Sequence, residues 1–273
     1  MEIARSEHPA VVLNGEVVVV GGLIERRVGG TAATSSVEAF DGSWRSLPDL
    51  PEPRHHAAAA VVDGRLFVLG GFDGSGFNAV STVWELSSAE WVDRAALPAP
   101  VGSGAAAVID GSIFLVGGVP EGALLVYDPV DDGWQRLADP LERREHLAAV
   151  AFEGELWALG GRWNGDAVSS TEVFDPTTGS WRPGPAMNQS RSGFGASVVD
   201  GSIVVAGGEV FEPLEALESV ERLIGGEWML DSPLPLGLHG NPLVSLDGVL
   251  HLPGGSEQPG GVANRGALFV LED

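Results

Sequence analysis

The chain has 273 residues, of which 44% are hydrophobic, so it is long and apolar enough to bury a sizeable core. It contains no Cys, which excludes disulfide bonds, thiolate metal sites and cysteine nucleophiles. All 15 basic residues are Arg, against 38 acidic residues, and the formal net charge of −23 argues against nucleic acid and membranes as partners.

The N-terminal segment Met1–Arg5 has no basic region followed by an apolar run, so it does not read as a signal peptide. No apolar run in the sequence approaches the ~20 residues that a membrane span needs. We therefore expect a cytoplasmic protein in which residues 1–273 form a single domain.

The first repeat unit begins with "VVLNGEVVVVGG", residues 11–22. The Asn-Gly step supplies the positive φ that a short hairpin needs, so this stretch predicts two strands joined by a tight turn and closed by a Gly pair. A third strand is expected in "SVEAFDG", residues 36–42, and Trp44 opens a fourth.

The same pattern returns five more times along the chain. Successive Gly pairs start 43 to 49 residues apart, at Gly21, Gly70, Gly117, Gly160, Gly207 and Gly254. Four short strands per unit in six units predict an all-β fold, a six-bladed β-propeller with four antiparallel strands in each blade. Trp91, Trp134, Trp181 and Trp228 open the later fourth strands, and we expect the five Trp of this series to be largely buried.

The sixth unit ends at Asp273 after its third strand and lacks the Trp strand. The N-terminus does not supply it, because Arg5 already stands in the place that Arg54 takes in the second unit. We therefore expect a three-stranded last blade, with Glu272 and Asp273 as edge charges that discourage further pairing.

The Gly pairs, the "VYDP" and "VFDP" steps, the Trp residues and the following "WRSLPDLP" and "WVDRAALP" resemble the Kelch repeat. The resemblance covers nearly the whole chain and implies a Kelch-type propeller. Kelch propellers often close by letting one terminus complete the last blade. This sequence departs from that pattern, because neither terminus supplies the missing strand. The resemblance implies much less about function, because propellers have many functions.

In an up-and-down blade, the loop that leads into the first strand and the loop that leaves the second strand lie at the same end. We call these the lead-in and exit loops, and the end of the channel where they meet the mouth. Ten residues before the hairpin Gly stand Arg5, Arg54, Val101, Arg144, Arg191 and Leu238. Arg in four of six copies resembles the repeat's own Arg, which the resemblance implies packs and pairs between blades.

The next two positions differ between the copies, so they are better candidates for function. In peptide-binding Kelch domains the corresponding positions project toward the ligand, so the resemblance implies a role in binding. The lead-in and exit loops together provide candidate acids and bases: His56, His146, Glu7, Glu145 and Glu209. They also provide candidate ligand-binding residues: Arg162, Trp163, His55, His239, Phe72 and Ser103.

Five of the six His residues fall in the lead-in loops. The ordinary interpretation is that the repeat tolerates His there, and His8 fits it. The alternative is a transition-metal site built by His56, His146 and His239, which come from alternate units around the ring. No cofactor is identified beyond this possible metal.

Two functions remain open at this point. The first is a stand-alone binding module that presents its mouth to a peptide, a protein or a small polar ligand. The second is a small-molecule isomerase or lyase that uses general acid-base catalysis at the same mouth, for which bacterial sialic-acid mutarotases on this fold are a precedent by analogy. A deep, narrow pocket would favour the enzyme, and a broad, shallow mouth would favour the module.

Overall fold

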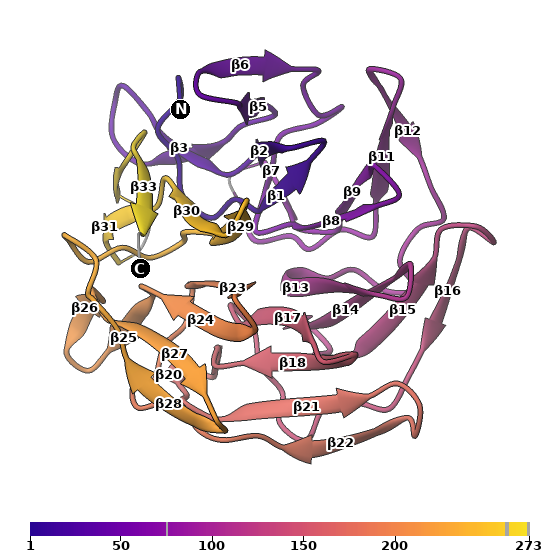
Figure 1. Cartoon of the computed structure of the whole chain (residues 1–273). Helices are drawn as coiled ribbons and strands as arrows, with labels where there is room; N and C mark the ends of the chain where they lie inside the picture. The colour runs from indigo at the N-terminus through magenta and orange to yellow at the C-terminus, as the bar shows by residue number, and fades with distance from the viewer. Residues whose placement is uncertain (75, 260–261, 272–273) are drawn as a thin grey trace.

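Six antiparallel sheets surround one axis in the computed structural model, which describes residues 1–74, 76–259 and 262–271. The chain passes once around the ring, so that the first and last blades lie side by side (Figure 1). The architecture confirms the predicted six-bladed all-β propeller. Among the described residues, none forms a helix with the length and apolar character that a membrane span requires.

Each blade is a meander whose first strand lies at the axis. The first three blades consist of β1 (Ala10–Leu13), β2 (Glu16–Val20), β5 (Val37–Phe40) and β6 (Trp44–Leu47); β8 (Ala58–Val62), β9 (Arg65–Leu69), β11 (Val83–Ser87) and β12 (Glu90–Asp93); and β13 (Gly102–Ile109), β14 (Ser112–Val119), β15 (Leu124–Asp128) and β16 (Gly133–Arg136). The next two consist of β17 (Ala148–Phe152), β18 (Glu155–Leu159), β21 (Thr171–Asp175) and β22 (Ser180–Pro183); and β23 (Gly195–Val199), β24 (Ser202–Ala206), β27 (Val220–Ile224) and β28 (Glu227–Leu230).

The last blade has three strands in the described part of the chain, β29 (Val244–Leu246), β30 (Val249–Pro253) and β33 (Leu268–Leu271), which confirms the prediction. Residues 1–4 do not add a strand: the Met1 ammonium donates to the Gly266 carbonyl, and the next two amides donate to the Glu38 carboxylate. The expected edge charges Glu272 and Asp273 lie outside the described residues.

Five short two-stranded sheets lie at the mouth in the described part of the chain. Four are exit hairpins, and the fifth joins a lead-in segment to an exit segment in the second blade. The exit hairpins are β3 (Leu23–Glu25) with β4 (Thr31–Ala33), β19 (Arg162–Trp163) with β20 (Asp166–Ala167), β25 (Glu209–Phe211) with β26 (Leu214–Ala216), and β31 (Ser256–Gln258) with β32 (Val262–Asn264). In the second blade β7 (Arg54–His55) pairs with β10 (Phe72–Asp73).

A closed ring of backbone hydrogen bonds surrounds the axis at the mouth. One residue from each lead-in loop donates its N–H to the carbonyl of its counterpart in the preceding blade, over 2.6 to 3.0 Å. All six adopt a left-handed φ between 50° and 59°. We call them the axial ring: Glu7, His56, Ser103, His146, Gly193 and Gly240. Because Glu7 donates to Gly240, the ring joins the first blade to the last without a shared strand.

A second ring of hydrogen bonds explains the Gly pairs. The second Gly of each pair donates its N–H to the lead-in carbonyl of the next blade, as Gly22 does to Arg54 and Gly255 does to Arg5. The first Gly lies directly beneath the same carbonyl: a Cβ on Gly21 would stand 2.4 Å from the Arg54 oxygen. The Gly pairs therefore permit neighbouring blades to approach at the axis.

The lead-in Arg side chains are buried, but three of them pair within their own blade and not between blades. Arg191 donates to the carbonyls of Gly207 and Ser219 and to the carboxylate of Glu221, at 2.5, 3.1 and 2.8 Å. Arg5 with Glu38 and Arg144 with Glu172 repeat this arrangement. The backbone carbonyl of the same residue makes the contact between blades.

The Trp series is largely buried, as expected: Trp228 is buried, and the other four are partly buried. The reason is that the indole bridges two blades at the outer edge. The indole N–H of Trp91 donates to the Pro48 carbonyl of the preceding blade at 3.0 Å, and Trp134, Trp181 and Trp228 make equivalent bonds.

Replacing Gly21 by Ala tests the approach of the blades, with Gly15→Ala as its control. Both glycines have positive φ, +61° and +80°, but a Cβ on Gly15 meets nothing within 4 Å. We expect Gly15→Ala to cost about 1 kcal/mol of unfolding free energy from backbone strain. Gly21→Ala should cost roughly 3 kcal/mol more, because the Arg54 carbonyl must move and its hydrogen bond from Gly22 weakens. Urea denaturation measures both values, and equal costs would contradict the role assigned to this close approach.

Candidate functional site

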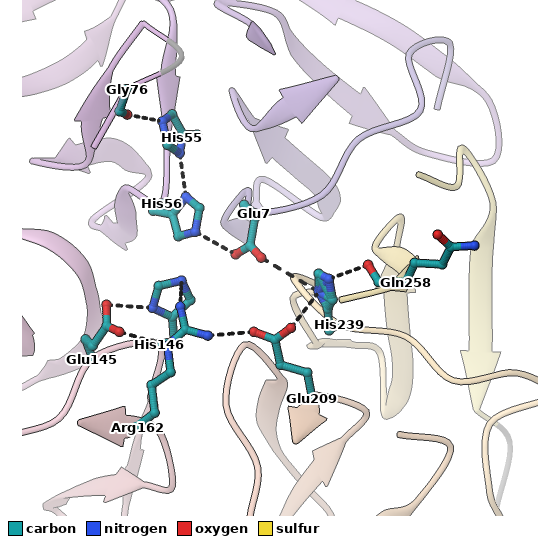
Figure 2. A network of polar contacts seen from close by, with 10 residues as sticks. All are labelled: Glu7, His55, His56, Gly76, Glu145, His146, Arg162, Glu209, His239 and Gln258. Atoms are coloured by element: carbon teal, nitrogen blue, oxygen red, sulfur yellow. Dashed lines mark hydrogen bonds and ion pairs between the residues drawn. The ribbon is translucent and has the colours of Figure 1, made fainter. Parts of the chain in front are cut away.

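Titratable side chains of the lead-in and exit segments form one network of hydrogen bonds and ion pairs (Figure 2). Its members come from the lead-in loops or exit segments of five blades and are largely buried. We call it the mouth cluster: Glu7, His55, His56, Glu145, His146, Arg162, Glu209 and His239. The structure thus brings together eight residues that the sequence nominated from distant positions.

One half of the mouth cluster is a chain of hydrogen bonds with a defined direction. The Gly76 carbonyl accepts from His55 Nε2 at 2.9 Å, so the proton of a neutral His55 lies on Nε2. His56 Nδ1 must then donate to His55 Nδ1, 2.5 Å away. This leaves His56 Nε2 as an acceptor, 3.2 Å from Glu7 Oε2.

The protonation of Glu7 agrees with this direction. Burial, and then the nearby Glu209 carboxylate, raise the pKa of Glu7 to about 8, while burial lowers the pKa of His56 well below its usual value. Near neutral pH Glu7 is therefore a carboxylic acid that donates to His56. A carboxylic acid next to a neutral imidazole can transfer a proton or, once ionised, bind a cation.

The other half of the mouth cluster centres on Arg162. Its guanidinium donates to Glu145 Oε1 at 2.8 Å and to Glu209 Oε1 at 2.7 Å, and lies 3.2 Å from His146 Nε2. Glu145 Oε2 accepts from His146 Nδ1 at 2.8 Å. Burial opposes the ionisation of Glu145, but the bonds from His146 and Arg162 outweigh it and lower the pKa of Glu145 to about 2. Burial also lowers the pKa of His146.

His239 lies beside these two halves. Its Nε2 donates to the Gln258 carbonyl at 2.9 Å, and its Nδ1 lies 3.8 Å from carboxylate oxygens of both Glu7 and Glu209. The side chain is 1% exposed, and burial lowers the pKa of His239 to about 4. Among the described residues, Nδ1 has no hydrogen-bond partner.

The grouping that could hold a metal differs from the three His of alternate blades. Ligand atoms of Glu7, His56 and His146 all lie within 4.8 Å of one another, in the part of the chain that the structure describes. His239 stands one position earlier in its loop than His56 and His146 do in theirs, and that position pairs with the exit segment. Glu7, which belongs to the axial ring together with His56 and His146, is therefore the third candidate ligand in place of His239.

The remaining candidates have different environments. Phe72 is 2% exposed and packs its ring against His55 and His56, with centroids 5.4 Å apart in both cases, so it supports the cluster. Ser103 belongs to the axial ring, and its buried hydroxyl has no hydrogen-bond partner among the described residues. Trp163 is half-buried on β19, where the Arg143 guanidinium lies 5.9 Å from its ring centre.

Sequence reasoning missed Phe77. Its ring is 69% exposed and lies over His55, His56 and Phe72, at 5.6, 5.9 and 5.2 Å between centroids. The available signal was the second of two Phe residues in the Gly-rich exit loop "FDGSGFN".

A cavity of about 180 Å³ lies in the central channel. Axial-ring residues and the small side chains of the first strands line it, including Ala58, Ala105, Ala149 and Ala196. Small residues are required where six strands converge on an axis, so this cavity follows from the fold.

Six blades, each with a Gly pair beneath the next lead-in loop and a mouth ringed by variable side chains, define a Kelch-type β-propeller. The family comparison agrees: the model described as "KLHDC2/KLHL20/DRC7 Kelch-repeats domain" matches residues 7–208. The chain belongs to the Kelch-repeat family.

Two curated relatives illustrate the extent of the similarity. Kelch-like protein terF of Aspergillus terreus is 29% identical over 287 residues, covering 93% of this chain and 62% of the relative. Human Kelch-like protein 33 is 28% identical over 167 residues, covering 60% of this chain and 24% of the relative. The chain thus spans less than two thirds of the length of either protein.

A solved structure described as "Structure of YjhT" has a TM-score of 0.82 with this one. The match covers 98% of this chain and 95% of that chain, at 16% sequence identity. This likeness concerns the fold alone.

His239 should contribute to acid sensitivity. Because its folded-state pKa of about 4 lies below the usual 6.5, the unfolded chain binds the proton more tightly, and stability falls as pH drops from 6.5 toward 4. We expect this residue alone to account for roughly 2 kcal/mol of the loss between about pH 7 and pH 5. His239→Gln keeps a donor for the Gln258 carbonyl and should reduce the loss by that amount in urea denaturation. Equal losses in the variant and the native protein would contradict the assignment.

Proposed function

We propose that the protein is a binding module whose mouth face recognises a segment of another protein or a peptide. The observation that carries this proposal is the placement of exposed apolar side chains on the exit segments. Val28, Phe77 and Leu214 are 93%, 69% and 64% exposed, and they lie in the exit segments of the first, second and fifth blades. Three exposed apolar side chains on one face of an otherwise acidic protein offer contacts for a partner.

The exit hairpins support this proposal because they contact one another along the edge of the mouth. We call this row of hairpins the wall. Hairpins of the fourth, fifth, sixth and first blades contact one another in that order, through β20 with β25, β26 with β31, and β32 with β3. In the described third blade, β14 instead reaches β15 through a turn at residues 120–123. Because the described third blade has no exit hairpin, the wall is open there, and an extended segment of a partner can reach the mouth across this blade.

The wall also contains a groove that suits one apolar side chain. It has a volume of about 370 Å³ and lies between the hairpins of the fifth and sixth blades, lined by Leu214, Leu236, Glu215 and Glu257 among others. Glu257 already pairs with Arg265, and Glu215, the other acidic side chain of the groove, favours a partner with an apolar anchor next to Arg or Lys. The net charge of −23 would steer such a basic partner toward the protein.

Catalysis at the same mouth has weaker support. The Glu7–His56 pair has the chemistry of an acid and a base, but its side chains are 11% and 5% exposed. The groups of the second half are mostly engaged by one another. The channel cavity of about 180 Å³ is small compared with the 300–1,000 Å³ usual for small-molecule sites. These features favour the binding module over the isomerase or lyase.

Selection from a displayed random-peptide library on the immobilised protein tests the proposal. We expect the enriched peptides to pair an apolar residue with Arg or Lys, and their Kd to rise with salt. Phe77→Ser and Leu214→Ser should each weaken an enriched peptide at least about tenfold in calorimetric titration, because each removes an exposed apolar contact.

Val130→Ser is the matched control for these variants. Val130 is 86% exposed, but it lies in the turn between β15 and β16, away from the exit segments. It should bind the peptides as the native protein does. Failure to enrich any peptide, or equal binding by Phe77→Ser, Leu214→Ser and the native protein, would overturn the proposal.

A further inference from the structure

We propose that Glu7, His56 and His146 bind a divalent transition-metal ion, with Zn²⁺ as the best match, on the propeller axis. Two imidazoles and one carboxylate form a donor set that suits Zn²⁺ and similar ions. The site goes beyond partner recognition by the exit hairpins, and it can be tested without any partner.

The geometry of the three side chains fits one ion. Their ligand atoms lie within 4.8 Å of one another, and His56 Nε2 is 3.2 Å from Glu7 Oε2. Two ligands at 2.0–2.1 Å from a tetrahedral ion are separated by roughly 3.3 Å, so this pair already has the required spacing. All three residues belong to the axial ring, whose backbone bonds hold their Cα atoms in place.

Each imidazole is also oriented for metal binding. His56 Nδ1 donates to His55 Nδ1, and His55 Nε2 donates to the Gly76 carbonyl. His146 Nδ1 donates to the Glu145 carboxylate. The other ring nitrogen, Nε2, lies 3.2 Å from Glu7 Oε2 in His56 and 3.2 Å from Arg162 Nη2 in His146. Its tautomer is thus fixed as in metal sites where a carboxylate or carbonyl holds the histidine.

The charge of the mouth cluster favours a cation. Glu7, Glu145 and Glu209 are largely buried, and Arg162 is the guanidinium that pairs with two of them. If all three carboxylates ionise, the cluster carries a net charge of −2, which a divalent ion would balance. Arg162 would give up its contact with His146 Nε2, but it would keep its bonds to Glu145 and Glu209.

An ion also has a route and room for a further ligand. Glu7, His56 and His146 all line the channel cavity of about 180 Å³. Such a volume holds several water molecules, so water can complete the coordination shell and the ion can enter through the channel.

Titration of the untagged, chelator-stripped 273-residue chain with ZnCl₂ and CoCl₂ tests the site. We expect one ion per chain and, for Co²⁺, the intense visible absorption of a tetrahedral complex. His56→Ala, His146→Ala and Glu7→Gln should each weaken binding at least about 100-fold, since each removes one ligand. His55→Ala, which removes the partner of His56 Nδ1 but no ligand, should weaken it about 10- to 100-fold.

His251→Ala is the matched control, because His251 lies on β30, outside the mouth cluster, and this variant should bind as the native chain does. X-ray absorption spectroscopy of the native zinc-loaded protein gives a readout that does not depend on how the variants fold, and it should show two imidazoles in the coordination shell. Absence of stoichiometric binding by the native chain, a shell without imidazole, or native affinity in folded His56→Ala and His146→Ala would overturn the proposal.

Discussion

The closed ring of six backbone hydrogen bonds at the mouth is the constraint on which the rest of this structure depends. Each bond joins neighbouring blades, and the bond from Glu7 to Gly240 joins the ends of the chain. A three-stranded last blade is compatible with closure because closure does not rely on a shared outer strand. The same ring places Glu7, His56 and His146 around one axis, although 139 positions separate the first from the last.

The repeat pattern in the sequence was sufficient to predict the blades, because Gly pairs, tight turns and Trp strands are local signals with a fixed spacing. It also nominated every member of the mouth cluster. It did not predict which residues meet, since a one-residue difference decides whether a side chain faces the axis. His239 pairs with the exit segment through Ser256, whereas His146 turns inward through its left-handed backbone. Phe77 was missed because loop length, not periodicity, brings it over the His pair.

The buried Arg residues show how one structural position can be satisfied in several ways. Arg191 and Glu221 form a fully buried ion pair in the fifth blade. In the second blade Arg54 instead stacks on Trp84, 4.6 Å from the ring centre, and in the third blade Val101 stands at the Arg position. Replacing both partners of a buried ion pair by apolar groups is often neutral, whereas replacing one leaves an unpaired charge. Arg54 is kept although its neighbour is Trp84 and not Glu, so the Arg position tolerates a change of partner.

The left-handed backbone of the axial ring also restricts which residue types can occupy its six positions. At φ between 50° and 59°, Gly, Asn, Asp and His are tolerated well, and β-branched side chains such as Val, Ile and Thr are strongly disfavoured. The six ring positions here contain only Gly, His, Ser and Glu. The left-handed backbone thus keeps the centre of this propeller polar by restricting which residue types fit there, independently of any ligand. Single substitutions at the ring positions can therefore change the chemistry at the axis, but only among a few, mostly polar residue types.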